Sequence, residues 1–179
     1  MTDERLHKIQ KTSRRFRLLF GGLLIVIPAV NVLFWLGFNH LPPGFLEGMP
    51  VAIARPLPVW VLASVFLVNL LPVGVAMYGM AALRKLFGLY EQGIIFSAET
   101  VACFRRLGWS VILWVLASTV FHTAASVLFT LGNPPGQKQL VIQFSSNHLA
   151  VIIAGGIVIL IARIMDQGRM LQDEQALTV

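Results

Sequence analysis

Few residues in the apolar parts of this sequence could do chemistry, and three of them suggest one polar cluster. Asn31, Asn69 and His122 each interrupt a long apolar run. Polar side chains in such a setting are costly and are usually functional or bonded to one another. Because imidazole titrates near neutral pH, a core centred on His122 could sense protons or hold a small ligand. The alternative, which the residue types favour, is that the three side chains only hold helices together.

Two further histidines, His40 and His148, lie near the ends of apolar runs. Together with His122 they have the residue type of a metal or haem site, but no cysteine or carboxylate accompanies them and no zinc spacing is present. We therefore expect neither metal nor cofactor. The single cysteine, Cys103, excludes an internal disulfide, and we expect a packed thiol there rather than an acylated one. Neither a nucleophile–base pair nor an acidic dyad is evident, which predicts a protein that is not an enzyme.

Four apolar runs must position these side chains. Hydrophobic residues make up 56% of the 179 residues and charged residues only 12%, against roughly 25% charged in soluble domains. The runs cover residues 18–38, 57–83, 109–131 and 147–165, and each is about long enough to cross a bilayer. Segments in hydrocarbon satisfy their backbone groups internally, so the runs predict helices. We expect one all-α domain, an integral membrane four-helix bundle whose helices extend into the cytoplasm.

The basic residues predict the orientation of these helices. Of the 14 lysines and arginines, 12 lie in the N-terminal arm, in loop 84–108 or near the C-terminus, and only Arg55 and Lys138 lie in the other two loops. Lysine and arginine are retained on the cytoplasmic side of membranes. We therefore expect a multi-pass protein of the bacterial inner membrane with both termini in the cytoplasm. The positive charge then faces lipid headgroups, and direct nucleic-acid binding is not expected.

The loop at residues 84–108 has the pattern of an ordered helical hairpin. An apolar stripe continues beyond the second run through Leu83, Leu86, Phe87 and Tyr90. Gly93 suits a left-handed helix stop, and Ser97 suits an N-cap with Glu99 in the first turn of the next helix. The fourth helix is expected to continue in the same way into the tail at residues 166–179. We predict a cytoplasmic hairpin beside this tail, where a partner docks on Phe96, Ser97, Arg105, Arg106, Leu171, Asp173 and Glu174.

Two segments at this end also resemble a known family. The stretches GIIFSAETVACFRRLGW, at residues 93–109, and LQDEQALTV, at residues 171–179, are similar to the signatures of the bacterial domain-of-unknown-function family 2975. The resemblance implies four membrane helices and carries over no catalytic residue. Members of that family are often described beside a small helix-turn-helix regulator, so the resemblance also implies a regulatory partner for this chain.

These observations lead to two hypotheses of different classes. The first is a non-enzymatic regulatory or sensory membrane protein that acts through its cytoplasmic hairpin and tail, on a regulator or on another membrane protein. The second is a small membrane transporter or ligand-binding bundle that uses a polar core around His122. Against the second, the runs hold no aspartate, glutamate, lysine or arginine before Arg163, which lies near the end of the fourth run. A single four-helix chain also leaves little room for a pore.

Overall fold

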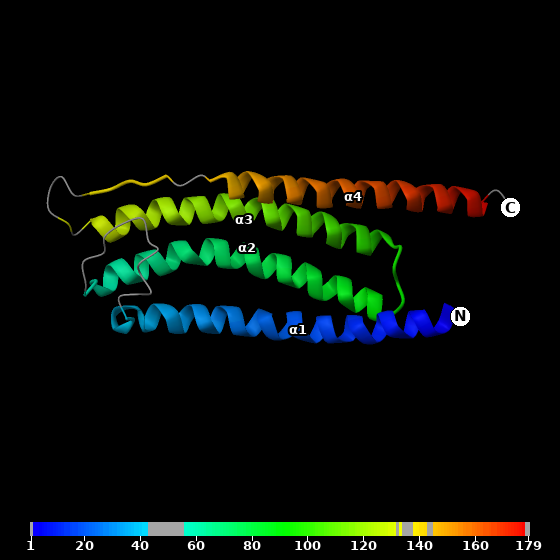
Figure 1. The fold of residues 1–179 in the computed structure, drawn as a ribbon, viewed down its shortest axis with the longest axis horizontal. Helices are drawn as coiled ribbons and strands as arrows, with labels where there is room; N and C mark the ends of the chain where they lie inside the picture. Colours follow the sequence, from blue (N-terminus) through cyan, green and yellow to red (C-terminus); the bar gives the residue numbers. More distant parts are fainter. Residues whose placement is uncertain (1, 43–55, 132, 134–137, 143–144, 178–179) are drawn as a thin grey trace.

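The chain folds into four long helices. The computed structural model describes residues 2–42, 56–131, 133, 138–142 and 145–177, and of residues 2–6 and 172–177 it describes the backbone alone. The elements are α1 (Thr2–Leu36), a short 3-10 helix η1 (Phe38–His40), α2 (Val59–Glu91), α3 (Ala98–Thr130) and α4 (Ser146–Leu177) (Figure 1). No strand occurs in the described ranges. The predicted all-α, four-helix class is confirmed.

All four helices are long and apolar enough to cross a membrane. They are also longer than a bilayer requires. Because an α-helix rises 1.5 Å per residue, the 33 residues of α2 span roughly 50 Å, against a hydrocarbon core of about 30 Å. The extra length agrees with the hairpin predicted at residues 84–108. Helix α2 continues past Leu83 to Glu91, and α3 begins at Ala98, well before Trp109.

The helices alternate in direction, and both termini lie at the same end of the molecule as the turn between α2 and α3 (Figure 1). We call this end the basic end, because the arginines and lysines of the α1 N-terminal half and of residues 84–106 gather there. At this end α1 and α4 run past the turn. The polar cluster and the predicted docking residues are therefore separated along the helices, the first in the half of the molecule away from the basic end and the second at the basic end.

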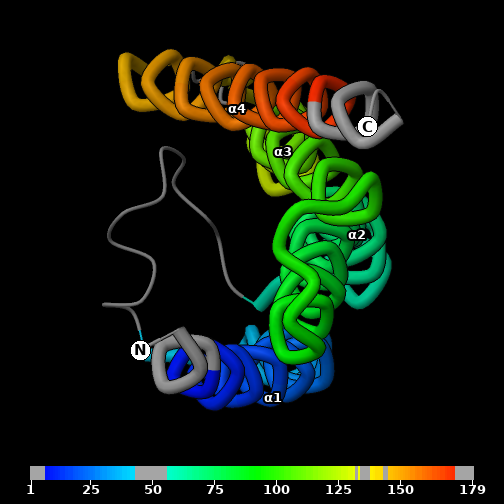
Figure 2. The backbone as a smooth tube through the Cα atoms, turned by 90° about the vertical axis from the view of Figure 1, so that its right-hand side faces the viewer, coloured from blue at the N-terminus to red at the C-terminus, as the bar shows by residue number. Residues whose placement is uncertain are grey.

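The bundle is open on one side. Figure 2 shows the helices as a curved row in chain order, with α1 and α4 at its two edges. Among the described elements, helix-to-helix contacts join α1 to α2, α2 to α3 and α3 to α4, and none joins α1 to α4. This order decides which side chains can meet, because only helices that are neighbours in the chain pack along their lengths.

An aromatic core closes the end opposite the basic end. Phe38 of η1 is fully buried and stacks on Trp35 of α1, with ring centroids 5.3 Å apart, and on Phe129 of α3, at 5.9 Å. Asn39 fixes the following chain with two hydrogen bonds. Its Nδ2 donates to the backbone oxygen of Leu57, and its Oδ1 accepts from the backbone N–H of Leu57, both at 3.1 Å. These contacts bring the start of α2 back against the end of α1.

Glycines allow α3 and α4 to approach closely. A Cβ at Gly108 would lie 2.8 Å from the backbone oxygen of Gly155, and a Cβ at Gly155 would lie 3.0 Å from the backbone oxygen of Gly108. Small residues at membrane helix interfaces permit such backbone contact. The neighbouring Gly156 has no other atom within 4 Å of its Cβ position, so only one glycine of the Gly155–Gly156 pair takes part.

A non-helical segment lies beside the last two turns of α3. The backbone N–H of Gln139 donates to Oγ1 of Thr130 at 3.2 Å, and that of Val141 donates to Oγ of Ser126 at 3.1 Å. The segment therefore runs back along α3 before α4 begins at Ser146. Irregular backbone is tolerated at membrane depth only where its polar groups find partners, and these two hydroxyls supply partners for two of them.

Candidate functional site

The turn at the basic end has a defined backbone structure. The N–H of Ile94 donates to the oxygen of Leu89 at 3.0 Å, and the N–H of Gly93 donates to the oxygen of Tyr90 at 3.1 Å. This pair of bonds is the Schellman motif, which requires a left-handed residue after the helix. Gly93 occupies that position with φ +79°, as its residue type predicts. The last carbonyls of α2 are thus satisfied without neighbouring elements.

Helix α3 starts directly after this turn. Ser97 has extended backbone angles, and its Oγ accepts a hydrogen bond from the backbone N–H of Thr100 at 3.1 Å. The predicted N-cap is therefore confirmed. Glu99 lies in the first turn, where its negative charge interacts favourably with the positive end of the helix dipole. Only residues 92–97 separate the two helices. The turn is held at both ends by local hydrogen bonds.

The hairpin formed by the ends of α2 and α3 has its own small core. Leu86 and Leu89 of α2 pack with Cys103 of α3, and Tyr90 and Phe104 cover them. The core explains why the sequence stays apolar beyond the predicted spans at this end. A polar linker would have no such face to bury.

Aromatic rings attach α1 to the outside of this hairpin. Phe87 of α2 stacks on Phe16 and Phe20 of α1, with centroid separations of 5.0 and 5.5 Å. The N-terminal half of α1 is thus a packed part of the basic end. The lead-in that precedes the first apolar run continues the helix without a break back to Thr2.

Ion pairs link the three helices of the basic end. Nε of Arg17 in α1 lies 3.1 Å from Oε2 of Glu91 in α2, and Nζ of Lys85 in α2 lies 3.1 Å from Oε2 of Glu99 in α3. The side chains remain partly exposed, so each pair is worth only about 0–1 kcal/mol. Their main effect is on side-chain orientation, because they hold Arg17 and Lys85 against carboxylates of the neighbouring helices.

The docking residues predicted from the sequence differ in how they are presented. Phe96 is 70% exposed at the tip of the hairpin, and Leu171 is 60% exposed on α4. Arg105 and Arg106 are exposed, whereas Ser97 is half-buried and committed to its cap. Asp173 and Glu174 lie outside the described side chains. An exposed phenylalanine in a turn whose backbone is fixed is the strongest docking feature of the set.

The thiol of Cys103 is held in its protonated form. The side chain is only 3% exposed. Burial raises the pKa of Cys103, and Glu99 adds to this, while Lys85 and Arg106 act in the opposite direction. Nucleophilic and redox chemistry need the thiolate. The geometry therefore supports the packed, unreactive cysteine expected from the sequence.

The polar cluster between α1 and α2 contains the two predicted asparagines. Nδ2 of Asn31 in α1 donates to Oδ1 of Asn69 in α2 at 2.5 Å, and the same oxygen accepts from Nε1 of Trp35 at 3.2 Å. The Trp35 contact was not foreseen, although Trp35 follows Asn31 by one helical turn and so shares its face. Oδ1 of Asn31 is buried and accepts no hydrogen bond from the described residues.

His122, the predicted centre of the cluster, is not brought to these asparagines. Its side chain is exposed on α3, beside Phe121 and close enough to His148 of α4 for their charges to interact. Because α2 separates α3 from α1 along the row, His122 does not reach Asn31, and its exposed side chain makes no hydrogen bond to Asn69 in the described structure. Among the described residues, no group of three or more histidine, cysteine, aspartate or glutamate side chains is placed to hold a metal ion.

The described residues form four helices that are long and apolar enough to cross a membrane, with an ordered basic end and a small internal amide cluster, and this arrangement is that of a multi-pass helical membrane protein. Comparison with protein-family models matches residues 54–179 to the family described as Protein of unknown function (DUF2975). The chain belongs to this family, and the resemblance seen in the hairpin and tail segments is confirmed. No curated protein and no solved structure matches the chain.

Proposed function

We propose that this protein is a non-enzymatic regulatory or sensory subunit of the bacterial inner membrane, with its basic end in the cytoplasm. The observation that carries the proposal is the α2–α3 hairpin. Its turn is closed by the Schellman motif at Gly93 and by the cap at Ser97, and between them Phe96 is 70% exposed. A fixed backbone that presents one large aromatic side chain loses little entropy on binding, and aromatic residues are enriched at binding hot spots.

The charges of the basic end support the proposed orientation. Arg105 and Arg106 are exposed near the start of α3, Arg84 and Lys85 directly follow the second apolar run, and Arg163 lies near the end of the fourth. Lysine and arginine are held on the cytoplasmic side by the positive-inside rule. The partner proposed is a cytoplasmic protein, such as a small helix-turn-helix regulator, or the cytoplasmic face of another membrane protein.

The geometry gives less support to the transporter or ligand-binding alternative. That alternative placed His122 in a polar core, but the side chain lies apart from Asn31 and Asn69. The amide cluster that does form has Asn69 bonded to both of its neighbours. Bonded amides of this kind serve helix association in membranes.

Site-specific photo-crosslinking in cells tests the proposal. A photoreactive amino acid at position 96 is expected to capture a discrete cytoplasmic protein. Deletion of residues 171–179 should reduce the yield of this crosslinked product if the tail forms part of the same surface. The same amino acid at Lys138, which is exposed at the opposite end, serves as the matched control and should capture no cytoplasmic protein. Absence of a specific product at position 96, or an identical product at both positions, would contradict the proposal.

A further inference from the structure

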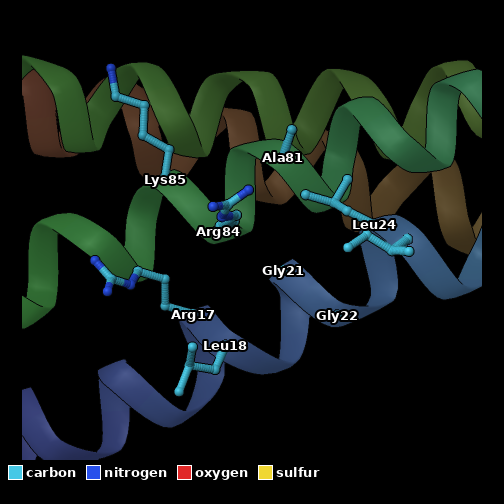
Figure 3. A pocket seen from close by; sticks show the side chains of 9 residues that line it. Arg17, Leu18, Gly21, Gly22, Leu24, Ala81, Arg84 and Lys85 are labelled. Carbon is cyan, nitrogen blue, oxygen red and sulfur yellow. The ribbon is translucent and has the colours of Figure 1, made fainter.

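A groove of about 700 Å³ lies between α1 and α2 at the basic end. Its polar side is formed by Arg17, Arg84 and Lys85, and its floor by Gly21 and Gly22 of α1 (Figure 3). It is separate from the hairpin tip and from the amide cluster, and the contacts described above leave it without a role.

Arg84 is the cation of this groove that remains available. Arg17 pairs with Glu91 and Lys85 pairs with Glu99. Among the described residues, no carboxylate pairs with Arg84. Figure 3 shows its guanidinium group over α1 at Gly21, while Lys85 points away from it. Because guanidinium presents several N–H donors in a plane, it matches the oxygens of a phosphate group.

The glycines make the space in front of this arginine. A Cβ at Gly21 would lie 3.7 Å from Nε of Arg84, and a Cβ at Gly22 would meet no other atom within 4 Å. Any larger side chain at these positions would therefore occupy the groove. The missing side chains leave α1 open on the face that Arg84 overhangs.

The groove changes from charged to apolar in the direction of the membrane. Arg17 directly precedes the first apolar run and Arg84 directly follows the second, so both lie at one membrane boundary. Leu18 and Ile25 line the groove on α1 and are 63% and 73% exposed. Ile25 is eight residues beyond Arg17, or about 12 Å deeper along the helix. The site thus offers a cation at headgroup level and an apolar wall below it.

From this arrangement we infer that the α1–α2 groove binds one anionic phospholipid. Its phosphate contacts Arg84, and an acyl chain lies along Leu18 and Ile25. A water-soluble phosphate would satisfy the arginine but leave the apolar wall uncovered. Basic pockets between membrane helices are the sites at which acidic lipid headgroups bind. The inference requires only that α1 and α2 span the membrane, and it is independent of the proposed partner.

Native mass spectrometry of the purified protein in detergent tests this site. Phosphatidylglycerol and phosphatidylcholine with identical acyl chains are titrated separately, and the dissociation constant of the first bound lipid is measured. We expect phosphatidylglycerol to bind more tightly, and Arg84→Gln to weaken it about fivefold, the effect of one basic contact near a membrane surface. Gly21→Leu should weaken it as well, although it leaves the charge unchanged.

Matched variants separate the groove from general surface charge. Arg163→Gln removes the same charge from an exposed position on α4, and Gly156→Leu adds the same side chain where no atom lies within 4 Å. Both should bind phosphatidylglycerol like the wild type. Equal losses in Arg84→Gln and Arg163→Gln would overturn the inference. So would displacement of the lipid by millimolar inorganic phosphate, which would assign the site to a free anion, or an unchanged affinity in folded Gly21→Leu.

Discussion

Asn31 donates a hydrogen bond from Nδ2 to Oδ1 of Asn69, and this 2.5 Å contact joins α1 to α2 in the middle of their apolar stretches. Trp35 adds a second donor to the same oxygen. The three side chains come from two helices that are neighbours in the chain. The cluster therefore fixes the rotation and the axial register of α1 against α2.

Replacing Asn69 by leucine should destabilise the protein more than replacing either donor. The change removes two hydrogen bonds and leaves the donors of Asn31 and Trp35 without an acceptor. Membrane hydrogen bonds are worth about 0.6 kcal/mol on average and up to about 1.7, so we expect a loss of roughly 1–3 kcal/mol. Unfolding by a denaturing detergent measures it. A double-mutant cycle with Asn31→Leu should show coupling, and strict additivity would mean that the bond does not stabilise the fold.

His122→Leu is the control for that experiment. The side chain is exposed and lies apart from the asparagines, so its replacement should change the free energy of unfolding by less than about 0.5 kcal/mol, as surface substitutions usually do. A large loss of stability in this variant would show that the histidine is held by contacts absent from the described structure.

The contact between Gly108 and Gly155 should tolerate no added side chain. Gly108→Val would place Cβ 2.5 Å from Cγ1 of Ile159 and 2.8 Å from the backbone oxygen of Gly155. Overpacking of this kind costs typically 1–3 kcal/mol, and here it should separate α3 from α4. Thermal unfolding measures the loss of stability. The separation is measured by the yield of disulfide crosslinking between cysteines placed on α3 and α4, or by the distance between spin labels on the two helices. Gly156→Ala, whose Cβ meets no other atom within 4 Å, should be neutral, and equal effects of the two changes would refute the packing.

The stability of the hairpin should fall at alkaline pH because of Cys103. Burial raises the pKa of this thiol above its value in the unfolded chain. A raised pKa means that the contribution to stability is complete below the ordinary thiol pKa of about 8.5 and is lost as pH rises through the folded value. Burial also raises the pKa of Tyr90, so the two groups act in the same direction. Unfolding curves of wild type and Cys103→Ala should diverge with pH, the variant being less sensitive above about pH 8.5.

Alkylation provides a second measure of the same thiol. N-ethylmaleimide should modify Cys103 slowly in the folded protein at pH 7.5 and rapidly after unfolding, because the reagent needs an accessible thiolate. The control is Phe96→Cys in a Cys103→Ala background, which puts a cysteine at the exposed hairpin tip. Equal rates at positions 103 and 96 would show that the hairpin core is open.

Sequence reasoning succeeded where the determining physics is local. Long apolar runs predict membrane helices from length alone, and Gly93 and Ser97 predict the two ends of a turn from backbone sterics and capping. These signals need no knowledge of which helix lies beside which. At the basic end the helices continue beyond the apolar spans, as the stripe through Leu86, Phe87 and Tyr90 predicts.

The sequence does not show which faces of the helices pack against one another, and the membership of the polar cluster depends on this. Asn31, Asn69 and His122 were expected together because each interrupts a long apolar run. In the structure Asn31 meets Asn69, whereas His122 is exposed on α3 and makes no hydrogen bond to either asparagine among the described residues. Trp35 could have been added from its spacing to Asn31. The backbone contact between Gly108 and Gly155 joins two segments that are distant in the sequence, so no local pattern predicts it.

The proposed function depends on the orientation in which the basic end, with the hairpin and both termini, faces the cytoplasm. Single cysteines at Phe96 and Lys138, each in a Cys103→Ala background, test it in intact cells with a membrane-impermeant maleimide. The cysteine at position 138 should be labelled in intact cells, whereas the cysteine at position 96 should be labelled only after the membrane is permeabilised. Labelling at position 96 in intact cells, with protection at position 138, would contradict it.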